Sequence, residues 1–279
     1  MLHTDTGKSS LMEISTGIQR LLDCRHHDPF SLLGKHDYAG DVLVRVLIPG
    51  AAWVRIAENG ASLQRMGNTD LFAWHGPSRQ LPDRYRLIWQ DSQGAEHVSY
   101  DPYCFLPQLS EFDLHLFAEG KHWHIYRILG AHRVQVEDVP GVRFAVWAPS
   151  AERVSVVGDF NNWDGRCHPM RVRGNSGVWE LFIPGLGVGQ AYKYEVRSRQ
   201  GDIALKTDPY GQHFELRPAN ATRVPALPNV YQWQDSNWMG TRQNSDWQHA
   251  PFSVYEVHLG SWRRDEHGNF LNYRQLAEE

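Results

Sequence analysis

Apolar and polar residues alternate with a period of two along most of the chain, and this alternation predicts strands with one buried face. In the clearest stretch Val142, Phe144 and Val146 form one face. Turn residues such as Pro and Gly interrupt the pattern at short intervals, which predicts an all-β fold of antiparallel sandwich type. The strands predicted in this way are 42–48, 53–57, 70–75, 84–90, 96–100, 142–147, 154–157, 178–183 and 191–197.

Two stretches carry helical periodicity instead. Residues 11–24 place their apolar side chains on one face, and Ser10 with Glu13 forms a capping-box pattern at their start. Residues 107–120 predict a connector with one short helix, which ends at Gly120 as its C-cap. The stripes expected to be buried are Leu11, Ile14, Ile18, Leu21 and Leu22 in the first helix, and Leu109, Phe112, Leu116 and Phe117 in the second.

The sequence repeats itself once, with the order of its motifs kept. Residues 33–36 (LGKH) return at 129–132 (LGAH), and residues 101–103 (DPY) return at 208–210. The offset between matched motifs drifts slowly, as expected of two related sandwiches that differ by loop insertions. The other matched segments are 45–49 with 143–149, 85–87 with 192–194, and 93–94 with 200–201.

The last part of the chain changes in character. Residues 231–250 are rich in Gln, Asn, Asp, Ser and Trp, which predicts a linker. Residues 253–260 are apolar with little alternation, as in a strand of a parallel sheet that is buried on both faces. A helix is predicted to begin at Tyr273. Without neighbouring strands the apolar edge would be unpaired, so we expect the segment from Pro251 onward to be poorly ordered or prone to aggregate.

Composition excludes several classes of protein. The net charge is −4, so no excess of cations favours a nucleic-acid backbone. The N-terminus lacks the apolar core of a signal peptide, and no apolar run approaches a membrane span. Cys24, Cys104 and Cys167 are too far apart for a metal motif or a disulfide framework, which indicates a reducing compartment. We therefore expect a cytoplasmic protein without a nucleic-acid or membrane partner.

Two motifs that could bind a cofactor have simpler explanations. His26 and His27 are adjacent, but no further His or Cys stands at ligand spacing, so they predict a loop before a strand rather than a metal site. The glycine-rich residues 184–189 lie between two predicted strands, whereas a phosphate-binding loop leads from a strand into a helix. The sequence thus predicts no metal and no cofactor.

The segment from Gly158 to Trp163 carries the most specific chemistry. Asn161 and Asn162 place two carboxamides beside the indole of Trp163. An aromatic ring can cover the C–H face of a sugar while amides bind its hydroxyl groups, so this loop is a candidate site for a polyhydroxylated ligand. The alternative is that Trp163 closes the end of a sandwich and the Asn side chains form Asx turns.

Four stretches, 27–34, 144–163, 179–185 and 255–264, carry a resemblance to a known family. In them the chain resembles the N-terminal part of bacterial 1,4-α-glucan (glycogen) branching enzymes of the α-amylase superfamily. The resemblance implies two tandem immunoglobulin-like β-sandwiches joined by a short helical connector, followed by the first strand and helix of an incomplete (β/α)8 barrel. The implied domains are an N-terminal sandwich at 1–120, a CBM48-type carbohydrate-binding sandwich at 121–230, the linker at 231–250 and the start of the barrel at 251–279.

The same resemblance implies the chemistry. The family transfers a segment of α-1,4-glucan to a 6-hydroxyl group without a cofactor, using a pair of carboxyl groups in the middle of the barrel. No position here matches that pair, so we name no catalytic residue and expect no activity from this chain alone. One departure is that residues 198–206 contain no aromatic side chain to stack a second glucose, which weakens the expected binding. The sugar contacts carried over from the family are Trp163, Asn161, Asn162, Lys193 and Asn220.

Two functional hypotheses follow. In the first, the chain is the non-catalytic part of a branching enzyme, binds α-1,4-glucan or glycogen, docks on the remainder of the catalytic barrel and is a monomer. In the second, it is an immunoglobulin-like scaffold that binds a protein, a reading that rests on fold analogy. Glucan binding that disappears in Trp163→Ala while the fold survives would count against the second.

Overall fold

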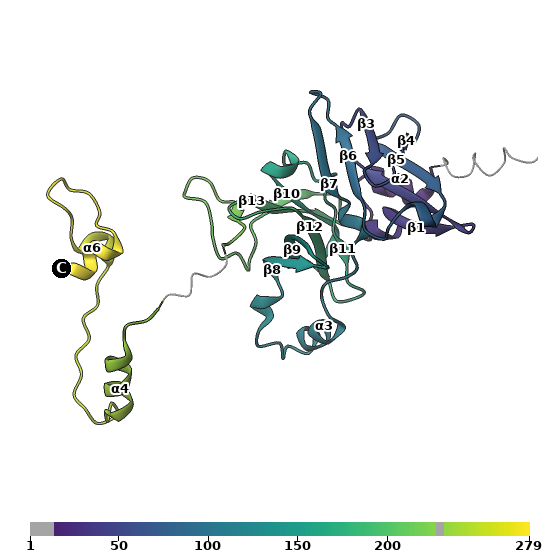
Figure 1. The fold of residues 1–279 in the computed structure, drawn as a ribbon. Helices are drawn as coiled ribbons and strands as arrows, with labels where there is room; N and C mark the ends of the chain where they lie inside the picture. The colour runs from purple at the N-terminus through teal and green to yellow at the C-terminus, as the bar shows by residue number, and fades with distance from the viewer. Residues whose placement is uncertain (1–13, 227–231) are drawn as a thin grey trace, which may run out of the picture. The chain divides into compact units, whose positions relative to one another are not determined.

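The structure is a computed structural model that describes residues 14–226 and 232–279. The chain divides into two units, Met1–Asn229 and Val230–Glu279, and each is described by itself. The described part of the first unit consists mainly of strands in four antiparallel sheets (Figure 1). The mainly-β class predicted from the alternation is therefore confirmed for this unit.

The first pair of sheets is built from residues 34–100. Side chains from both sheets meet in one core, because alternation turns one face of each sheet inward; its members include Val44, Val46, Ile56 and Phe72. One sheet has the order β1 (Gly34–Tyr38), β2 (Asp41–Leu47), β5 (Leu71–Gly76) and β4 (Gln64–Arg65), and the other has the order β3 (Trp53–Ile56), β6 (Arg86–Gln90) and β7 (Glu96–Tyr100).

The second pair of sheets repeats this arrangement strand for strand. One sheet has the order β8 (Gly130–Val136), β9 (Val139–Trp147), β12 (Val178–Pro184) and β11 (Arg171–Val172). The other has the order β10 (Ala151–Gly158), β13 (Ala191–Ser198) and β14 (Ile203–Lys206), with β15 (Thr222–Arg223) beside β13. Segments matched in the sequence repeat thus occupy matched positions in the sheets.

The two copies also share a positive-φ glycine and a buried Tyr–Asp hydrogen bond. Gly34 and Gly130 both have a positive φ, 89° and 99°, and lie against Tyr103 and Tyr210. A buried Tyr hydroxyl donates to a buried Asp carboxylate in each copy, which ties the end of one strand to the following turn. These bonds run from Tyr85 to Asp101 at 2.5 Å and from Tyr192 to Asp208 at 2.6 Å.

Strand β2 is buried on both faces, although its alternation predicts one buried face. Val44 and Val46 belong to the first core. Leu43 and Leu47 belong to a second core, which they share with buried side chains of β9, β10, β12 and β13. Helix α2 (Thr16–Leu22) adds two buried side chains to this shared core. The first pair of sheets therefore packs directly against the second.

Helix α2 is shorter than the predicted helix over 11–24. Ser15 caps its N-terminus, since its Oγ accepts from the backbone N–H of Ile18 at 3.3 Å. The predicted capping pair, Ser10 and Glu13, lies outside the described residues.

Helix α3 (Glu111–Ala118) forms the connector, and Gly120 follows it in the left-handed region as predicted. The predicted apolar stripe is wrong at one position. Phe112 is exposed, whereas Leu114 is buried against Leu129 in a small core under the helix. The helix begins only at Glu111, so the side chain that faces the sheets is set by that start rather than by the spacing from Leu109.

The alternation does not predict β1, β8 or β14. All three lie at sheet edges, where one side of the strand is open and polar side chains are tolerated. None of the described helices is both long and apolar enough to span a membrane. Short 3-10 turns complete the unit: η1 (Pro29–Ser31), η2 (Ser78–Gln80), η3 (Pro102–Cys104), η4 (Ile125–Arg127) and η5 (Asp159–Asn161).

The described residues of the second unit form helices α4 (Ser236–Asn244), α5 (Leu259–Trp262) and α6 (Tyr273–Glu278). Helix α4 lies inside the predicted linker, and α6 confirms the predicted terminal helix. The strand predicted at 253–260 is not formed in the structure, because residues 251–258 have no regular structure and Val254 and Tyr255 are 80% and 77% exposed. A strand needs a neighbour for its backbone hydrogen bonds, and no described strand pairs with this segment.

Candidate functional site

The loop after β10 is folded around one buried carboxamide, that of Asn161. Its Oδ1 accepts from the N–H of Gly158 at 2.9 Å. Its Nδ2 donates to the carbonyl of Val156 at 2.9 Å and to Nδ1 of His168 at 2.8 Å. These bonds use both amide hydrogens inside the protein. Asn161 therefore supports the loop, and its amide hydrogens are already used inside the protein rather than offered to a sugar.

His168 completes this support. Burial lowers the pKa of His168 from 6.5 to about 4, so the ring is neutral at physiological pH and its Nδ1 accepts the bond from Asn161. Sequence reasoning missed this residue because a His that follows Asn161 by seven positions in a loop gives no periodic signal.

Asn162 and Trp163 form the accessible face of the loop. Both have a positive φ, 53° and 59°, a conformation that costs a non-glycine residue roughly 1–3 kcal/mol and is often kept at functional sites. The indole Nε1 of Trp163 donates to Oδ1 of Asp159 at 2.9 Å, which holds the ring in place. Asn162 is exposed and Trp163 is half-buried, so solvent reaches both.

Lys193 and Asn220 are brought together on the neighbouring strand. Lys193 lies on β13 opposite Val157, the residue before the end of β10. Its Nζ donates to Oδ1 of Asn220 at 2.5 Å. The backbone N–H of Trp163 returns to the carbonyl of Gly158 at 3.0 Å, so the loop stays at the same end of the sheet as this pair.

The matched position in the first copy differs in its electrostatics. Arg86 corresponds to Lys193 in the repeat, and its Nε lies 3.1 Å from Oε1 of Glu58. That ion pair neutralises the guanidinium. Lys193 instead bonds to a neutral amide and keeps its charge and its remaining donors. The turn at 57–60 in the first copy also has no aromatic side chain, whereas the matched loop of the second copy carries Trp163.

The site offers binding groups from one ring and a few polar side chains. Residues 198–206 add Ile203 and Leu205, both exposed aliphatic side chains, but no second ring. Within the described ranges no three His, Cys, Asp or Glu side chains are placed to hold a metal ion. The arrangement can stack against a ring and hydrogen-bond to hydroxyl groups.

Comparison with protein families assigns both halves of the first unit. Residues 15–103 match the family described as alpha-1,4-glucan branching enzyme GlgB, N-terminal domain. Residues 128–211 match carbohydrate-binding module 48 (isoamylase N-terminal domain). The chain is thus similar to the N-terminal portion of the GlgB branching enzymes. The Trp163 loop and Lys193 lie inside the residues matched to carbohydrate-binding module 48, and Asn220 lies beyond them.

Individual GlgB relatives agree with this assignment. The 1,4-alpha-glucan branching enzyme GlgB of Nitrosococcus oceani is 56% identical, over 96% of this chain and 36% of its own length. The enzymes of Cellvibrio japonicus and Methylococcus capsulatus are 52% and 50% identical, over 95% and 98% of this chain and 37% of their own lengths. The chain thus spans 36–37% of the length of these GlgB relatives. Among solved structures, apo pullulanase from Klebsiella pneumoniae is 18% identical over 75% of this chain and 25% of its own, with a TM-score of 0.33.

Proposed function

We propose that this chain is the glucan-binding, non-catalytic part of a 1,4-alpha-glucan branching enzyme of glycogen biosynthesis. The whole enzyme would transfer a segment of α-1,4-glucan to a 6-hydroxyl group and so form an α-1,6 branch. In this proposal the two pairs of sheets are tandem immunoglobulin-like sandwiches, and the second holds the glucan while the rest of the enzyme acts on it. The GlgB relatives at 50–56% identity support the proposal.

The placement of a charged Lys193 beside the Trp163 loop is the observation that carries the binding role. The indole would cover the C–H face of a glucose unit, where it replaces water on an apolar surface. Lys193 and Asn162 would donate to the glucose hydroxyl groups, and Asn220, which already accepts from Lys193, would orient the ammonium. A bond from an ammonium is stronger than one from a neutral donor, which favours this copy over the first.

The second unit fits the start of a catalytic barrel in the same proposal. The large side chains Phe252, Val254 and Tyr255 are all exposed in succession. An apolar run of this kind marks a surface that other parts of a protein cover. We assign to it the first barrel strand, which would form once neighbouring strands supply its backbone partners.

The glucan-binding role is tested by native affinity electrophoresis in gels with and without glycogen. We expect glycogen to retard the parent chain and Trp163→Ala to bind about tenfold more weakly or not at all, which corresponds to about 1.4 kcal/mol. The matched control is Trp123→Ala, since Trp123 is 88% exposed and lies in the connector far along the chain from the loop. Both variants should keep the far-UV spectrum of the parent.

Other outcomes point elsewhere. Equal retardation of the parent and Trp163→Ala would remove the loop from the glucan site. No retardation of either would leave the loop structural, and the protein-binding scaffold would become the better hypothesis.

A further inference from the structure

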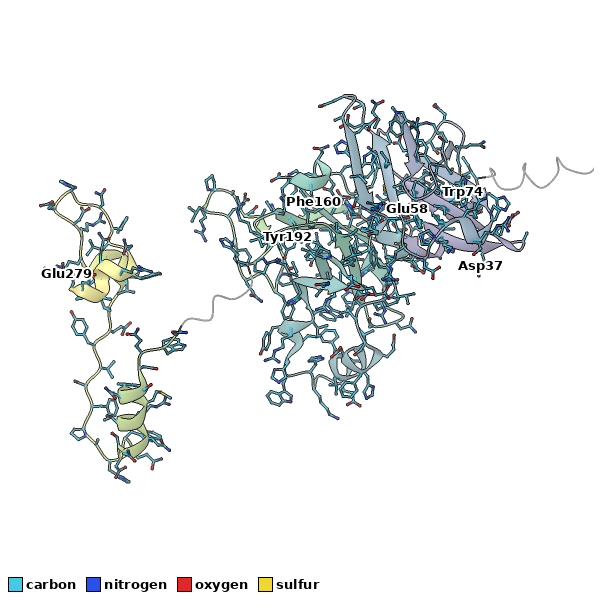
Figure 2. The ribbon with its side chains drawn as sticks, in the orientation of Figure 1. Asp37, Glu58, Trp74, Phe160, Tyr192 and Glu279 are labelled. Atoms are coloured by element: carbon cyan, nitrogen blue, oxygen red, sulfur yellow. The ribbon has the colours of Figure 1, made fainter. Side chains whose placement is uncertain are left out.

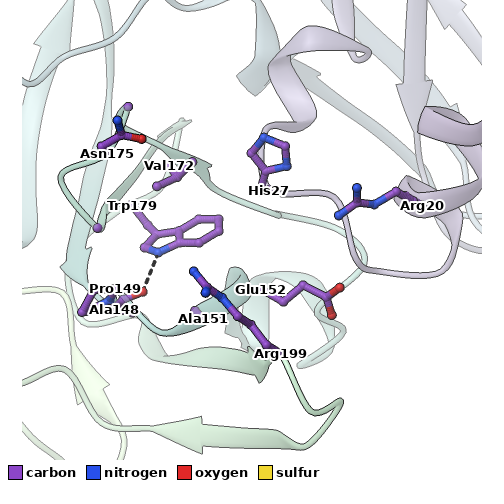
Figure 3. Close-up of a pocket in the computed structure, with 12 residues that line it drawn as sticks. Arg20, His27, Ala148, Pro149, Ala151, Glu152, Val172, Asn175, Trp179 and Arg199 are labelled. Atoms are coloured by element: carbon purple, nitrogen blue, oxygen red, sulfur yellow. Dashed lines mark hydrogen bonds between the residues drawn. The ribbon is translucent and has the colours of Figure 1, made fainter.

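A cleft of about 550 Å³ lies at the other end of β10 from the Trp163 loop. Its volume is within the size range of small-molecule sites. Strand β10 has 8 residues, so the two ends are roughly 25 Å apart. The walls come from the segment before the first pair of sheets and from the second pair of sheets (Figure 3). Arg20 and His27 lie in the N-terminal segment, Glu152 lies at the start of β10, and Asn175 and Arg199 lie in turns of the second pair of sheets.

The lining of the cleft is cationic. Arg199 and Arg20 have no carboxylate partner among the described residues, and the Arg20 guanidinium donates only weakly, to the carbonyl of Arg25 at 3.5 Å. The one carboxylate in the lining, Glu152, is already bound. Its oxygens lie 3.0 Å from Nη2 of Arg25 and 3.0 Å from Nε of Arg197. The two unpaired guanidinium groups therefore leave a net positive charge in the cleft.

The floor of the cleft offers no aromatic face on which a ring of a ligand could stack. Trp179 lies at its centre, but it is only 2% exposed and its Nε1 donates to the carbonyl of Ala148 at 3.0 Å (Figure 3). A buried indole offers no open face to a base or to a sugar ring. Apart from Glu152, the polar side chains that line the cleft are two guanidinium forks, the amide of Asn175 and the imidazole of His27. Guanidinium forks match the geometry of phosphate oxygens.

We propose that this cleft binds a phosphorylated monosaccharide. The phosphate lies on Arg199 and Arg20, and the sugar hydroxyl groups bond to Asn175 and His27. The phosphate alone would fill a small part of the cleft, which leaves room for one sugar unit. Because Arg20 lies on α2 and Arg199 follows β13, the ligand would contact the N-terminal segment and the second pair of sheets at once. This proposal does not depend on the glucan site at Trp163.

The test is calorimetric titration of the full chain at low ionic strength with four probes: a hexose 6-phosphate, the same hexose without phosphate, inorganic phosphate and inorganic sulfate. We expect saturable binding of the hexose phosphate and none of the free hexose. Arg199→Ala and Arg20→Ala should each weaken binding at least about fivefold, since each removes a charged donor. Binding should weaken as salt is added. Trp163→Ala should bind the hexose phosphate as the parent does.

The matched control is Arg79→Ala, which removes an exposed arginine on η2 that forms no ion pair with any residue in the described ranges. It should leave the affinity unchanged. Unaltered binding in both Arg199→Ala and Arg20→Ala, with the spectra of the parent, would overturn the proposal. It would also fail if the hexose phosphate did not bind, or if inorganic phosphate and sulfate bound as tightly as the hexose phosphate, because the sugar would then contribute nothing.

Discussion

At the scale of single residues, the unpaired charge of Lys193 distinguishes the second copy from the first. Its Nζ bonds to a neutral amide at 2.5 Å, whereas its counterpart Arg86 is held by Glu58 at 3.1 Å. We expect Lys193→Ala to weaken glycogen binding about three- to tenfold, the worth of one or two hydrogen bonds. Arg86→Ala is the control from the matched position and should bind as the parent does. Equal losses in the two variants would show that copy-specific charge is not the cause.

His168 makes the support of the loop sensitive to acid. Its pKa is about 4 in the folded protein against 6.5 in the unfolded chain. Between these values the unfolded chain binds the extra proton, so the stabilisation is complete above pH 6.5 and is lost as the pH falls toward 4. Asp101 acts in the opposite sense. Burial raises the pKa of Asp101 to about 6, so the folded state takes up the extra proton and this contribution is lost as the pH rises through 6.

Because these effects oppose each other, the prediction for His168 is a difference between two proteins. In His168→Gln the free energy of unfolding should fall less between pH 7 and pH 4 than in the parent, by up to about 3 kcal/mol. Urea titrations at pH 7, 5.5 and 4 measure it. His115→Gln, an exposed position on α3, should follow the parent at each pH. Parallel curves for the parent and His168→Gln would contradict the assignment.

The sequence located the loop but not the roles inside it. Two adjacent Asn residues beside a Trp indicated a polar aromatic site, and Trp163 and Asn162 are accessible as that reading requires. It could not distinguish Asn162 from Asn161, since burial in a loop follows no period and the deciding partner is His168. The cleft between Arg20 and Arg199 left no trace in the sequence, because its walls are far apart in the chain.

At the scale of elements, the tight approach of β1 to the turn after β7 depends on glycine. Gly34 has φ +89°, and an added Cβ would stand 2.6 Å from the carbonyl oxygen of Tyr103. Gly40 has nearly the same φ, +88°, but nothing lies within 4 Å of its would-be Cβ. Gly40→Ala should therefore lose about 1–2 kcal/mol of stability from the left-handed backbone alone. Gly34→Ala should lose clearly more in urea titrations, and equal losses would show that the close approach is not tight in solution.

Strands with an apolar pattern were predictable, and edge strands without one were not. Strands β2, β9, β12 and β13 were predicted from alternation. The repeat correctly placed matched segments at matched sheet positions. Edge strands such as β1 carry polar residues on both faces and gave no signal. The apolar run at 253–260 shows the opposite case. Its composition predicts a buried strand, but its backbone has no described neighbour with which to pair.

At the scale of the molecule, one buried carboxylate ties the connector to the N-terminal segment and to the second pair of sheets. Glu180 on β12 lies 3.0 Å from Nε of Arg171 and 3.2 Å from Nη1 of Arg173, and it accepts from the N–H of Leu109 at 2.9 Å. The guanidinium of Arg171 also stacks over Phe30, 3.6 Å from the ring centre. The network thus joins the N-terminal segment, the connector and the second pair of sheets.

Breaking this network should destabilise the whole first unit. Glu180→Gln leaves the largely buried guanidinium of Arg171 without its counter-charge, a change that costs about 3–5 kcal/mol, whereas Arg173 keeps its ion pair with Glu111 at 2.6 Å. We expect that loss in urea unfolding followed by tryptophan fluorescence. Glu119→Gln removes one partner of an exposed pair with Lys121 and should cost less than about 1 kcal/mol. A loss in Glu180→Gln as small as in the control would mean that solvent already screens the network.

The sheet that contains β2 has a core on each of its faces. A pulling force applied across the first unit would load both cores together, because the same strands bear on each. The two copies should then unfold together, in a single event, when the unit is stretched. Because the two copies share a core, duplication of the sequence would then have added no module that unfolds independently.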